Sequence, residues 1–348
     1  MDFDVVIATR NRPEALELSL PLLLAQSRLP AQIIVVDSSD DPAPVADLVA
    51  RLSGGRVPLR LLRSEKGLTR QRNLGLRQVT APVVFLPDDD SLTHPGATEA
   101  LMRVYERDSE GLIAGVRCVD APEPPPGVDL GASYAMSAAH VQEARMKRLR
   151  RFVERGLADR NPFPVMGRAL SDLRPVPGWL AEEEAVKVGW MTGYLMSFRS
   201  DVVRAFGFEE AFAGYGLFED IDASFQALGH GALVAAERAR IYHHRAPSGR
   251  PDPYAMAAMS LVNRGLIFAK QFATGRLTPA QIADIRARTM SYARLRMLGL
   301  MPRLHRAEAR ATLRGTRAGM AALPQLFSAP PERLPQVYAG IADGLKIG

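Results

Sequence analysis

Cysteine is almost absent from this chain of 348 residues, and aromatic residues make up only 7% of it. The single cysteine, Cys118, excludes a disulfide framework and a metal site built from several thiolates. No stretch of 18 uncharged apolar residues occurs, so the sequence shows no evident transmembrane helix. The first residues also lack the basic and then apolar order of a signal peptide. We therefore expect a soluble, cytoplasmic protein.

Acidic residues are scarce in one segment of the chain. Residues 276–317 hold ten arginines and two acids, which gives this segment a net charge of +8. The whole chain has a net charge of +6, so the remaining residues carry −2. A basic segment of this kind suggests a nucleic-acid binder as one function. The low aromatic content, the lack of a recognised nucleic-acid-binding module and the slightly acidic remainder argue against that function.

Hydrophobic residues make up 47% of the chain, enough for a sizeable core. In the first third, short apolar runs alternate with helical patterns. Strands are expected at residues 3–8, 33–37, 59–63, 82–86 and 112–119, and helices at 13–26, 43–52, 67–79 and 95–108. This alternation predicts an α/β fold whose central sheet is mostly parallel and flanked by helices.

Ligands bind such sheets beyond the carboxyl ends of the strands. Thr9, Asp37, Lys66 and Asp88 to Asp90 all fall just after predicted strand ends. Further along, the segment 161–178 is expected to be a loop, 218–231 a helix and 232–245 a strand. From about residue 253 the pattern is largely helical.

Three consecutive aspartates, Asp88 to Asp90, follow the apolar run VVFL with one proline between them. Adjacent like charges repel, and folding alone does not require them. They could form a solvated turn that caps the next helix, since aspartate is a good N-cap residue. Alternatively they form a divalent metal site, because Mg²⁺ and Mn²⁺ bind carboxylate oxygens together with substrate phosphates.

Six segments in fixed order carry a family resemblance. They read VVIATRNRPEAL, IIVVDSSDD, KGLTRQRNLGL, VVFLPDDDSLTHPG, GWMTGYLMSFRSDVVRAFGFEEAFAGYGLFEDIDASFQALGHG and IYHHR, within residues 3–245. Together they resemble the family 2 glycosyltransferases, which have a GT-A fold. The resemblance implies a Rossmann-like GT-A domain over residues 1–250, with a nucleotide-binding half (1–120) and an acceptor-binding half (121–250). A helical C-terminal region, 251–348, follows it.

The resemblance also implies a role for each matching residue. Nucleotide binding is implied for Thr9, Arg12, Asp37, Gly67, Arg72, Asp88 and Asp89, with Asp37 facing the base and Asp88 the ribose. Metal binding is implied for Asp90 and for His243 or, as the second choice, His244. The general base is implied to be Asp220, with Glu219 as the competing choice. Acceptor contacts are implied for Trp190, Thr192 and Gly193.

The reaction implied is an inverting transfer that depends on Mn²⁺ or Mg²⁺. The sugar would move from a UDP-, dTDP- or GDP-linked donor to a glycan or lipid-linked hydroxyl, in bacterial surface or extracellular polysaccharide synthesis. One alternative is a non-catalytic sugar-nucleotide binding protein. Another is a nucleotidyltransferase acting on sugar phosphates, which usually has a glycine-rich loop that ATRNRPEA lacks.

Simpler explanations exist for several of these residues. Glu219 and Asp220 could be acids in the first turn of a helix, where the helix dipole favours them. His243 and His244 could be surface or core histidines, and Trp179 is expected to pack in the core rather than contact an acceptor.

Five arginines recur at helical spacing near the C-terminus. They are Arg303, Arg306, Arg310, Arg314 and Arg317. This spacing predicts one continuous stripe down a helix. The stripe could be an ordinary solvated face, or it could dock onto anionic lipid head groups and hold the protein on the inner face of the plasma membrane.

Overall fold

The computed structural model describes residues 1–130, 156–157, 159–212, 215–245 and 252–347. The contacts divide the chain into two compact units. Unit 1 comprises Met1–Pro125 and Gly167–Arg250, and unit 2 comprises Pro126–Met166 and Pro251–Ile347.

Unit 1 is built around one mixed sheet. Its described strands are β1 (Phe3–Thr9), β2 (Gln32–Asp37), β3 (Leu59–Arg63), β4 (Val83–Phe85), β5 (Ser91–Thr93), β6 (Ile113–Asp120), β7 (Ala185–Val188), β8 (Met196–Arg199) and β9 (Ala232–His243). The order is β3-β2-β1-β4-β8-β6-β9-β5, with β7 also paired to β9. Strands β5, β7 and β8 run against the other strands. The predicted α/β class with a mostly parallel sheet is confirmed.

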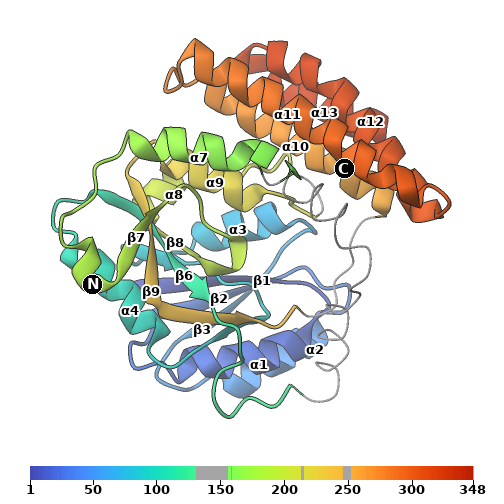
Figure 1. Cartoon of the computed structure of the whole chain (residues 1–348). Helices are drawn as coiled ribbons and strands as arrows, with labels where there is room; N and C mark the ends of the chain where they lie inside the picture. The colour runs from blue at the N-terminus through green and yellow to red at the C-terminus, as the bar shows by residue number, and fades with distance from the viewer. Residues whose placement is uncertain (131–155, 158, 213–214, 246–251, 348) are drawn as a thin grey trace. The chain divides into compact units, whose positions relative to one another are not determined.

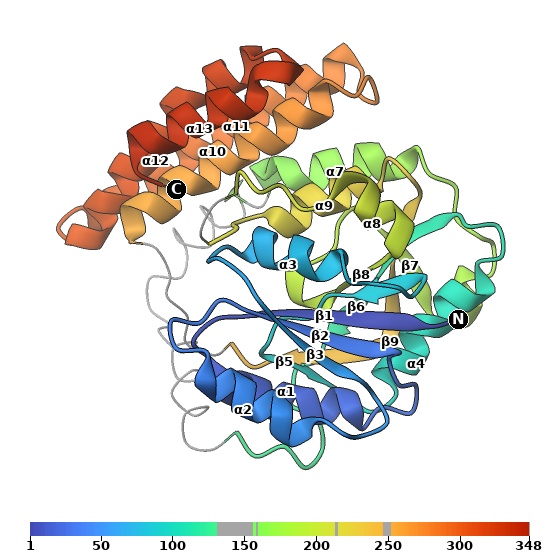
Figure 2. The ribbon, with the colours of Figure 1, turned by 180° about the vertical axis from the view of Figure 1, so that it is seen from behind.

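Helices cover both faces of this sheet (Figure 1). They are α1 (Pro13–Leu24), α2 (Ala43–Leu52), α3 (Leu68–Leu76), α4 (Ala97–Arg107), α8 (Ser200–Phe206) and α9 (Glu219–Ala227), with the 3₁₀ turns η1 (Leu180–Glu183) and η2 (Gly193–Leu195). Helices α1 and α2 lie on one face and α3 on the other, as the reverse view in Figure 2 also shows. Phe3, Val5 and Ile7 of β1 join Leu16 and Leu20 of α1 in the main apolar core. Strands buried on both faces explain the continuous apolar runs of the sequence.

The predicted loop at 161–178 is wrong, because α7 occupies Pro162–Asp172. Two prolines near its start suggested a loop, but proline is tolerated in the first turn of a helix. Phe163, Met166 and Leu170 lie three and four residues apart, and all three are buried. This helical apolar spacing outweighs the turn signal of the prolines.

The parallel register brings several strand ends together. Thr9 of β1 pairs with Asp37 of β2, and Asp37 pairs with Arg63 of β3. Strand β4 ends at Phe85, three residues before Asp88. The ends of four neighbouring parallel strands therefore carry polar residues along one edge, where ligands bind in sheets of this type.

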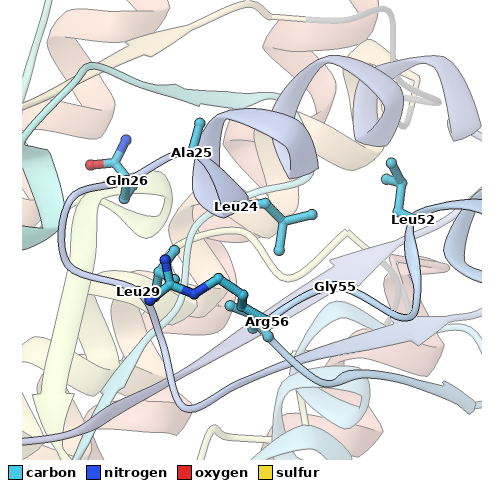
Figure 3. Close-up of a pocket in the computed structure, with 8 residues that line it drawn as sticks. Leu24, Ala25, Gln26, Leu29, Leu52, Gly55 and Arg56 are labelled. Atoms are coloured by element: carbon cyan, nitrogen blue, oxygen red, sulfur yellow. The ribbon is translucent and has the colours of Figure 1, made fainter.

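A cavity of 360 Å³ lies away from that edge (Figure 3). It is lined by residues at the ends of α1 and α2 and the loop after α2, among them Leu24, Leu29, Leu52 and Arg56. Helix α1 follows the carboxyl end of β1 and runs back, so its last residues lie near the amino ends of the strands. The cavity is therefore separate from the polar strand ends.

Unit 2 contains a group of C-terminal helices. They are α10 (Pro253–Phe272), α11 (Pro279–Leu300), η3 (Met301–Arg303), α12 (Ala307–Ser328), η4 (Pro331–Arg333) and α13 (Leu334–Leu345). Gly315 and Gly319 of α12 allow close contact with α10, since an added Cβ at Gly315 would lie 2.1 Å from the carbonyl oxygen of Tyr254. Among the described residues, no helix has the length and apolar character needed to cross a bilayer.

The predicted continuous arginine stripe is wrong in one respect. The chain leaves helical geometry between η3 and α12, where Arg306 is extended (φ −88°, ψ 134°). Arg310, Arg314 and Arg317 lie on α12, whereas Arg303 ends η3 and Arg306 precedes α12. Pro302, which cannot donate a main-chain hydrogen bond, interrupts the helix here. All five arginines are exposed.

We predict that Gly75→Ala destabilises unit 1. Gly75 of α3 lies so close to β1 that an added Cβ would come within 2.3 Å of Cγ1 of Val6. Overpacking costs about 1–3 kcal/mol, and the gain in helix propensity is at most about 1 kcal/mol. The urea midpoint of unfolding should therefore fall. Gly55→Ala is the control, because nothing lies within 4 Å of its Cβ position. Equal midpoints for the two variants would contradict the close approach of α3 to β1.

Candidate active site

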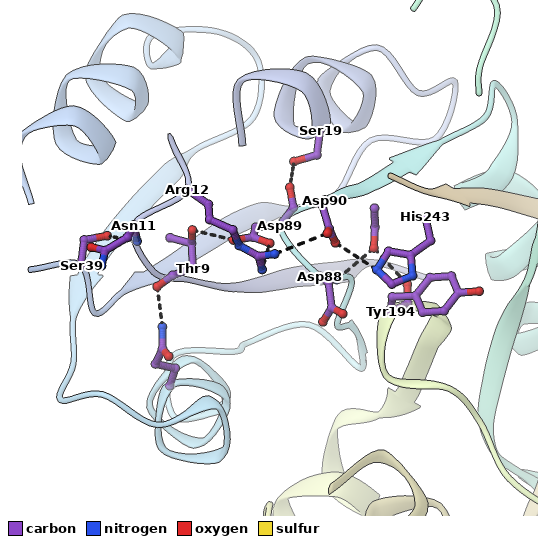
Figure 4. A network of polar contacts seen from close by, with 12 residues as sticks. Thr9, Asn11, Arg12, Ser19, Ser39, Asp88, Asp89, Asp90, Tyr194 and His243 are labelled. Atoms are coloured by element: carbon purple, nitrogen blue, oxygen red, sulfur yellow. Dashed lines mark hydrogen bonds and ion pairs between the residues drawn. The ribbon is translucent and has the colours of Figure 1, made fainter. Parts of the chain in front are cut away.

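Asp89 is the most buried of the three aspartates, with a side chain that is 0% exposed. The hydroxyl of Thr9 donates to its Oδ2 over 2.7 Å, and the guanidinium of Arg12 pairs with both of its carboxylate oxygens (Figure 4). The hydroxyl of Ser19 on α1 donates to its main-chain oxygen over 2.7 Å. Burial raises the pKa of Asp89 to about 7, against the opposing charge of Arg12. Asp89 thus fixes the loop after β4 to β1 and α1.

Unlike Asp89, the other two aspartates, Asp88 and Asp90, lie close to His243. Ligand atoms of these three residues all fall within 4.8 Å of one another. Nε2 of His243 is 3.3 Å from Oδ1 of Asp90, and Nη1 of Arg12 is 3.4 Å from Oδ2 of Asp90. Asp88 and His243 are 32% and 25% exposed and Asp90 is 4% exposed, so a ligand would reach the group from the side of Asp88 and His243. We refer to Asp88, Asp90 and His243 as the acidic cluster.

The pairing of two distant strands brings His243 to the acidic cluster. Ser91 of β5 pairs with His243 of β9, and the main-chain N–H of His244 donates to the carbonyl oxygen of Asp90 over 3.1 Å. The ring of Tyr194 stacks on that of His243 with centroids 4.2 Å apart. Burial acts to lower the pKa of His243, but its hydrogen bond to Asp90 and the charge of Asp90 raise it overall. Within the described residues, this grouping includes His243 and not His244.

Arg72 of α3 is a buried cation between two acidic segments, and its side chain is 2% exposed. One guanidinium nitrogen pairs with Oε1 of Glu219, and the other donates to Oδ1 of Asp88 over 2.9 Å and to the carbonyl oxygen of Gly193 over 3.4 Å. Burial raises the pKa of Glu219 to about 8, the charge of Asp220 adds to the rise, and Arg72 opposes it. A single guanidinium therefore joins α3, the loop after β4, η2 and α9.

Asp220 is held at the start of α9 by main-chain donors. The N–H of Gly193 donates to its Oδ2 over 2.9 Å and that of Ile221 to its Oδ1 over 2.8 Å. Burial raises the pKa of Asp220, although these two hydrogen bonds stabilise the ionised form. An added Cβ at Gly193 would lie 3.1 Å from Oε1 of Glu219, so glycine suits this position. The side chain of Asp220 is half-buried, and the two hydrogen bonds fix its orientation.

The residues expected to hold a nucleotide lie along the strand ends. Asp37 is fully buried, its Oδ1 accepts from the main-chain N–H of Ser39 over 2.8 Å, and its Oδ2 pairs with Arg63. Gly67 precedes α3 at φ +146°, a conformation that side chains disfavour. The role of Asp37 toward a base stays a prediction, and Ser39 and Arg63 fix its orientation.

The segment expected to meet an acceptor lies against α9. The main-chain N–H of Met191 donates to the hydroxyl of Ser224 over 2.9 Å, which holds Trp190 and Thr192 beside that helix. Both of these side chains are half-buried. Trp179, in contrast, packs against the core, with the guanidinium of Arg107 5.0 Å from its ring.

Sequence reasoning missed three residues that shape the site. Ser19 is 1% exposed in the middle of α1, where a lone hydroxyl in an apolar helix was the only signal. Arg63 ends β3, and its place beside Asp37 depends on the strand register. Tyr194 follows Gly193 directly, so the sequence pointed to this segment. It did not show that the ring of Tyr194 stacks on His243.

A family model supports the resemblance. Residues 4–155 match the model described as glycosyl transferase family 2. The "Uncharacterized glycosyltransferase YwdF" of Bacillus subtilis (strain 168) is 31% identical over 109 residues, which cover 30% of this chain and 39% of that protein. The match thus spans well under half of the length of this curated relative. The resemblance that the motifs carry is confirmed, and the family model includes the segments around Thr9, Asp37, Arg72 and the aspartates.

Two solved structures are similar to this chain. The mannosyltransferase PcManGT from Pyrobaculum calidifontis, in complex with GDP-Man and Mn²⁺, is similar over 99% of this chain and 83% of its own, with a TM-score of 0.50 and 18% identity. S. aureus TarS 1-349 in complex with UDP-GlcNAc is similar over 93% of this chain and 92% of its own, with a TM-score of 0.46 and 15% identity. The first similarity confirms the predicted α/β fold with its helical C-terminal region.

We predict that Arg72→Met lowers the free energy of unfolding by about 3–5 kcal/mol, because it leaves buried Glu219 without its cation. Arg70→Met is the matched control on the same helix. Arg70 is 49% exposed and pairs with exposed Glu65, and such surface pairs contribute at most about 1 kcal/mol. Urea unfolding of both variants measures the difference.

A double substitution tests the contact between Arg72 and Glu219 further. Glu219→Gln in the Arg72→Met background removes the unpaired carboxylate, so it should recover part of the lost stability. An Arg72→Met variant no less stable than Arg70→Met would contradict the buried contact.

Proposed function

We propose, from the match of residues 4–155 to glycosyl transferase family 2, that this chain is an inverting, metal-dependent glycosyltransferase. It would move a sugar from a nucleoside diphosphate to an acceptor hydroxyl. The observation that supports this most is the acidic cluster at the carboxyl edge of the sheet, joined through Arg72 to the acids that begin α9.

The acidic cluster suits a divalent cation. Two carboxylates fit either Mn²⁺ or Mg²⁺, and an imidazole ligand is more typical of transition metals, which favours Mn²⁺. Asp88, Asp90 and His243 would hold the ion, and the stacked ring of Tyr194 would fix the histidine. Asp88 is thereby assigned to the metal, whereas the resemblance implied a contact with the ribose. When bound, such an ion offsets the charge that develops on a diphosphate leaving group. PcManGT, whose fold is similar, was solved with Mn²⁺.

Asp220 is the residue we assign as general base. An acceptor hydroxyl must lose its proton as its oxygen attacks the anomeric carbon, and a carboxylate of raised pKa takes a proton more readily. Two main-chain N–H groups fix the orientation of Asp220. Glu219 is paired with buried Arg72, which makes it the weaker choice. With one base and no covalent nucleophile, attack opposite the leaving diphosphate inverts the anomeric carbon.

The remaining expected site residues show by their positions where we assign the donor and the acceptor. Thr9, Arg12, Asp37 and Gly67 lie along the strand ends, where a UDP, dTDP or GDP group would bind. Arg72 and Asp89 were also expected at the nucleotide, and they pair with Glu219 and Arg12 in this structure. Trp190, Thr192 and Gly193 would contact the acceptor, a glycan or lipid-linked hydroxyl. In this assignment residues 1–120 hold the donor, 121–250 meet the acceptor and 251–348 form a separate helical region. A place in bacterial surface or extracellular polysaccharide synthesis is part of the proposal.

We predict that the chain slowly hydrolyses one nucleotide-sugar donor in the presence of Mn²⁺. A panel of UDP-, dTDP- and GDP-sugars, assayed for released nucleoside diphosphate with Mn²⁺ or with EDTA, identifies the donor. Release should cease with EDTA. Release that continues undiminished in EDTA would contradict metal dependence, and absence of both release and nucleotide binding would contradict the function.

We also predict that Asp90→Asn weakens binding of Mn²⁺ by at least about tenfold, because it removes a charged oxygen ligand. Calorimetry in the presence of the donor nucleotide measures this without turnover. Asp47→Asn, at an exposed position on α2, is the matched control and should bind as the wild type does. Equal binding by both variants would exclude Asp90 as a ligand.

For the base, we predict that Asp220→Asn lowers the rate of nucleotide release by about 10²–10⁴-fold. Its binding of nucleotide and Mn²⁺ should stay unchanged, since Asp220 is not part of the acidic cluster. If Asp220→Asn releases nucleotide at the wild-type rate, Asp220 is not the general base and Glu219 takes its place as the candidate.

A further inference from the structure

The turn between α11 and α12 exposes large apolar side chains. Leu298 is 64% exposed and Met301 is 56% exposed. They lie three residues apart near the end of α11, so they share one face. Exposed apolar side chains that lie together mark interaction surfaces, because folding gains nothing from leaving them in water. We call residues 298–306 the α11–α12 tip.

Arginines surround these apolar side chains. Arg294 lies one turn before Leu298 on the same face, and Arg303 and Arg306 lie within the tip. All three are exposed, and among the described residues none of them is paired with a carboxylate. Glu308 is the only acid in the sequence between Asp284 and Glu332. The tip therefore carries a net positive charge.

The tip is a fixed turn. Nη1 of Arg310 donates to the carbonyl oxygens of Leu304 and His305, each over 2.9 Å. The main-chain N–H of Arg306 donates to the carbonyl oxygen of Arg303 over 2.9 Å. These bonds satisfy carbonyl groups that the interrupted helix leaves free. The backbone that presents the apolar pair and the arginines is thus ordered before binding.

We propose that the α11–α12 tip docks onto a bilayer surface that contains anionic phospholipids. Leu298 and Met301 enter the boundary between head groups and acyl chains, and Arg294, Arg303 and Arg306 contact head-group phosphates. Apolar insertion flanked by basic side chains is the chemistry by which peripheral helices bind such surfaces. This contact goes beyond the proposed reaction, and its test uses no measurement of turnover.

Other partners fit the tip less well. A second copy of this chain, meeting tip to tip, would bring the same arginines into contact and repel. A nucleic acid would engage the arginines, but the tip holds no Phe, Tyr or Trp on which a base could stack, and His305 is its one ring. Of these three partners, a lipid surface is the one that uses both the apolar pair and the charges.

Vesicle flotation of the full chain tests the proposal. Vesicles of phosphatidylcholine alone are compared with vesicles that also contain phosphatidylglycerol. The wild type should float with the anionic vesicles only. Each arginine near an anionic surface contributes about fivefold to partitioning, so Arg303→Gln with Arg306→Gln should lower it about 25-fold. Leu298→Gln with Met301→Gln should also lower it.

A matched control removes the same charge elsewhere. Arg77→Gln with Arg333→Gln changes two exposed arginines, one at the end of α3 and one beyond the end of α12 opposite the tip. This variant should float as the wild type does. An equal loss in the control and tip variants, or no flotation of the wild type, would overturn the proposal.

A label at the tip reports insertion directly. Cys118 is only 1% exposed, so an environment-sensitive thiol dye should react at Leu298→Cys alone. Its emission should move to shorter wavelength with anionic vesicles and stay unchanged with phosphatidylcholine. An unchanged emission with both would overturn the apolar contact. Tip variants that alter the sedimentation coefficient in the absence of lipid would instead assign the face to a second copy.

Discussion

The buried contact between Asp89 and Arg12 allows three adjacent aspartates to coexist. Asp89 is removed from solvent and paired, so its charge is balanced within the protein. The turn that begins at Asp88 is closed by a hydrogen bond from the Ser91 N–H to the Asp88 carbonyl oxygen. Asp89 of this turn is fixed against β1, whereas Asp88 and Asp90 lie close to His243. Arg12 also reaches Asp90, which lowers the repulsion that remains within the acidic cluster. An unfavourable run of charge thus becomes a candidate metal site.

A second cation extends this arrangement across unit 1. Arg72 contacts Asp88 on one side and Glu219 on the other, so the proposed metal site and the start of α9 are held by one guanidinium. Gly193 links the same guanidinium to Asp220, through its carbonyl oxygen and its N–H. Donor binding and proton removal would then depend on groups whose relative positions are fixed before substrate arrives, which lowers the cost of orienting them.

The sequence predicted the strands of the first third because buried parallel strands are continuous apolar runs. It also identified the acids, since their order along the chain follows a known family. It could not show that Asp89 turns inward, because that depends on Arg12, far away in the sequence. Strand β5 has three residues, too few for a periodic pattern, yet its pairing positions His243. Prolines hid α7, and Pro302 broke a helix that arginine spacing alone predicted to be continuous.

In our proposal Asp88, Asp90 and His243 form one metal site. Anomalous diffraction at the manganese edge, from crystals grown with Mn²⁺ and a nucleoside diphosphate, tests it most directly. We expect one strong peak in contact with all three side chains, with the diphosphate on its open side. A peak elsewhere, or none in crystals that show bound nucleotide, would contradict the claim and leave the three aspartates as a structural turn.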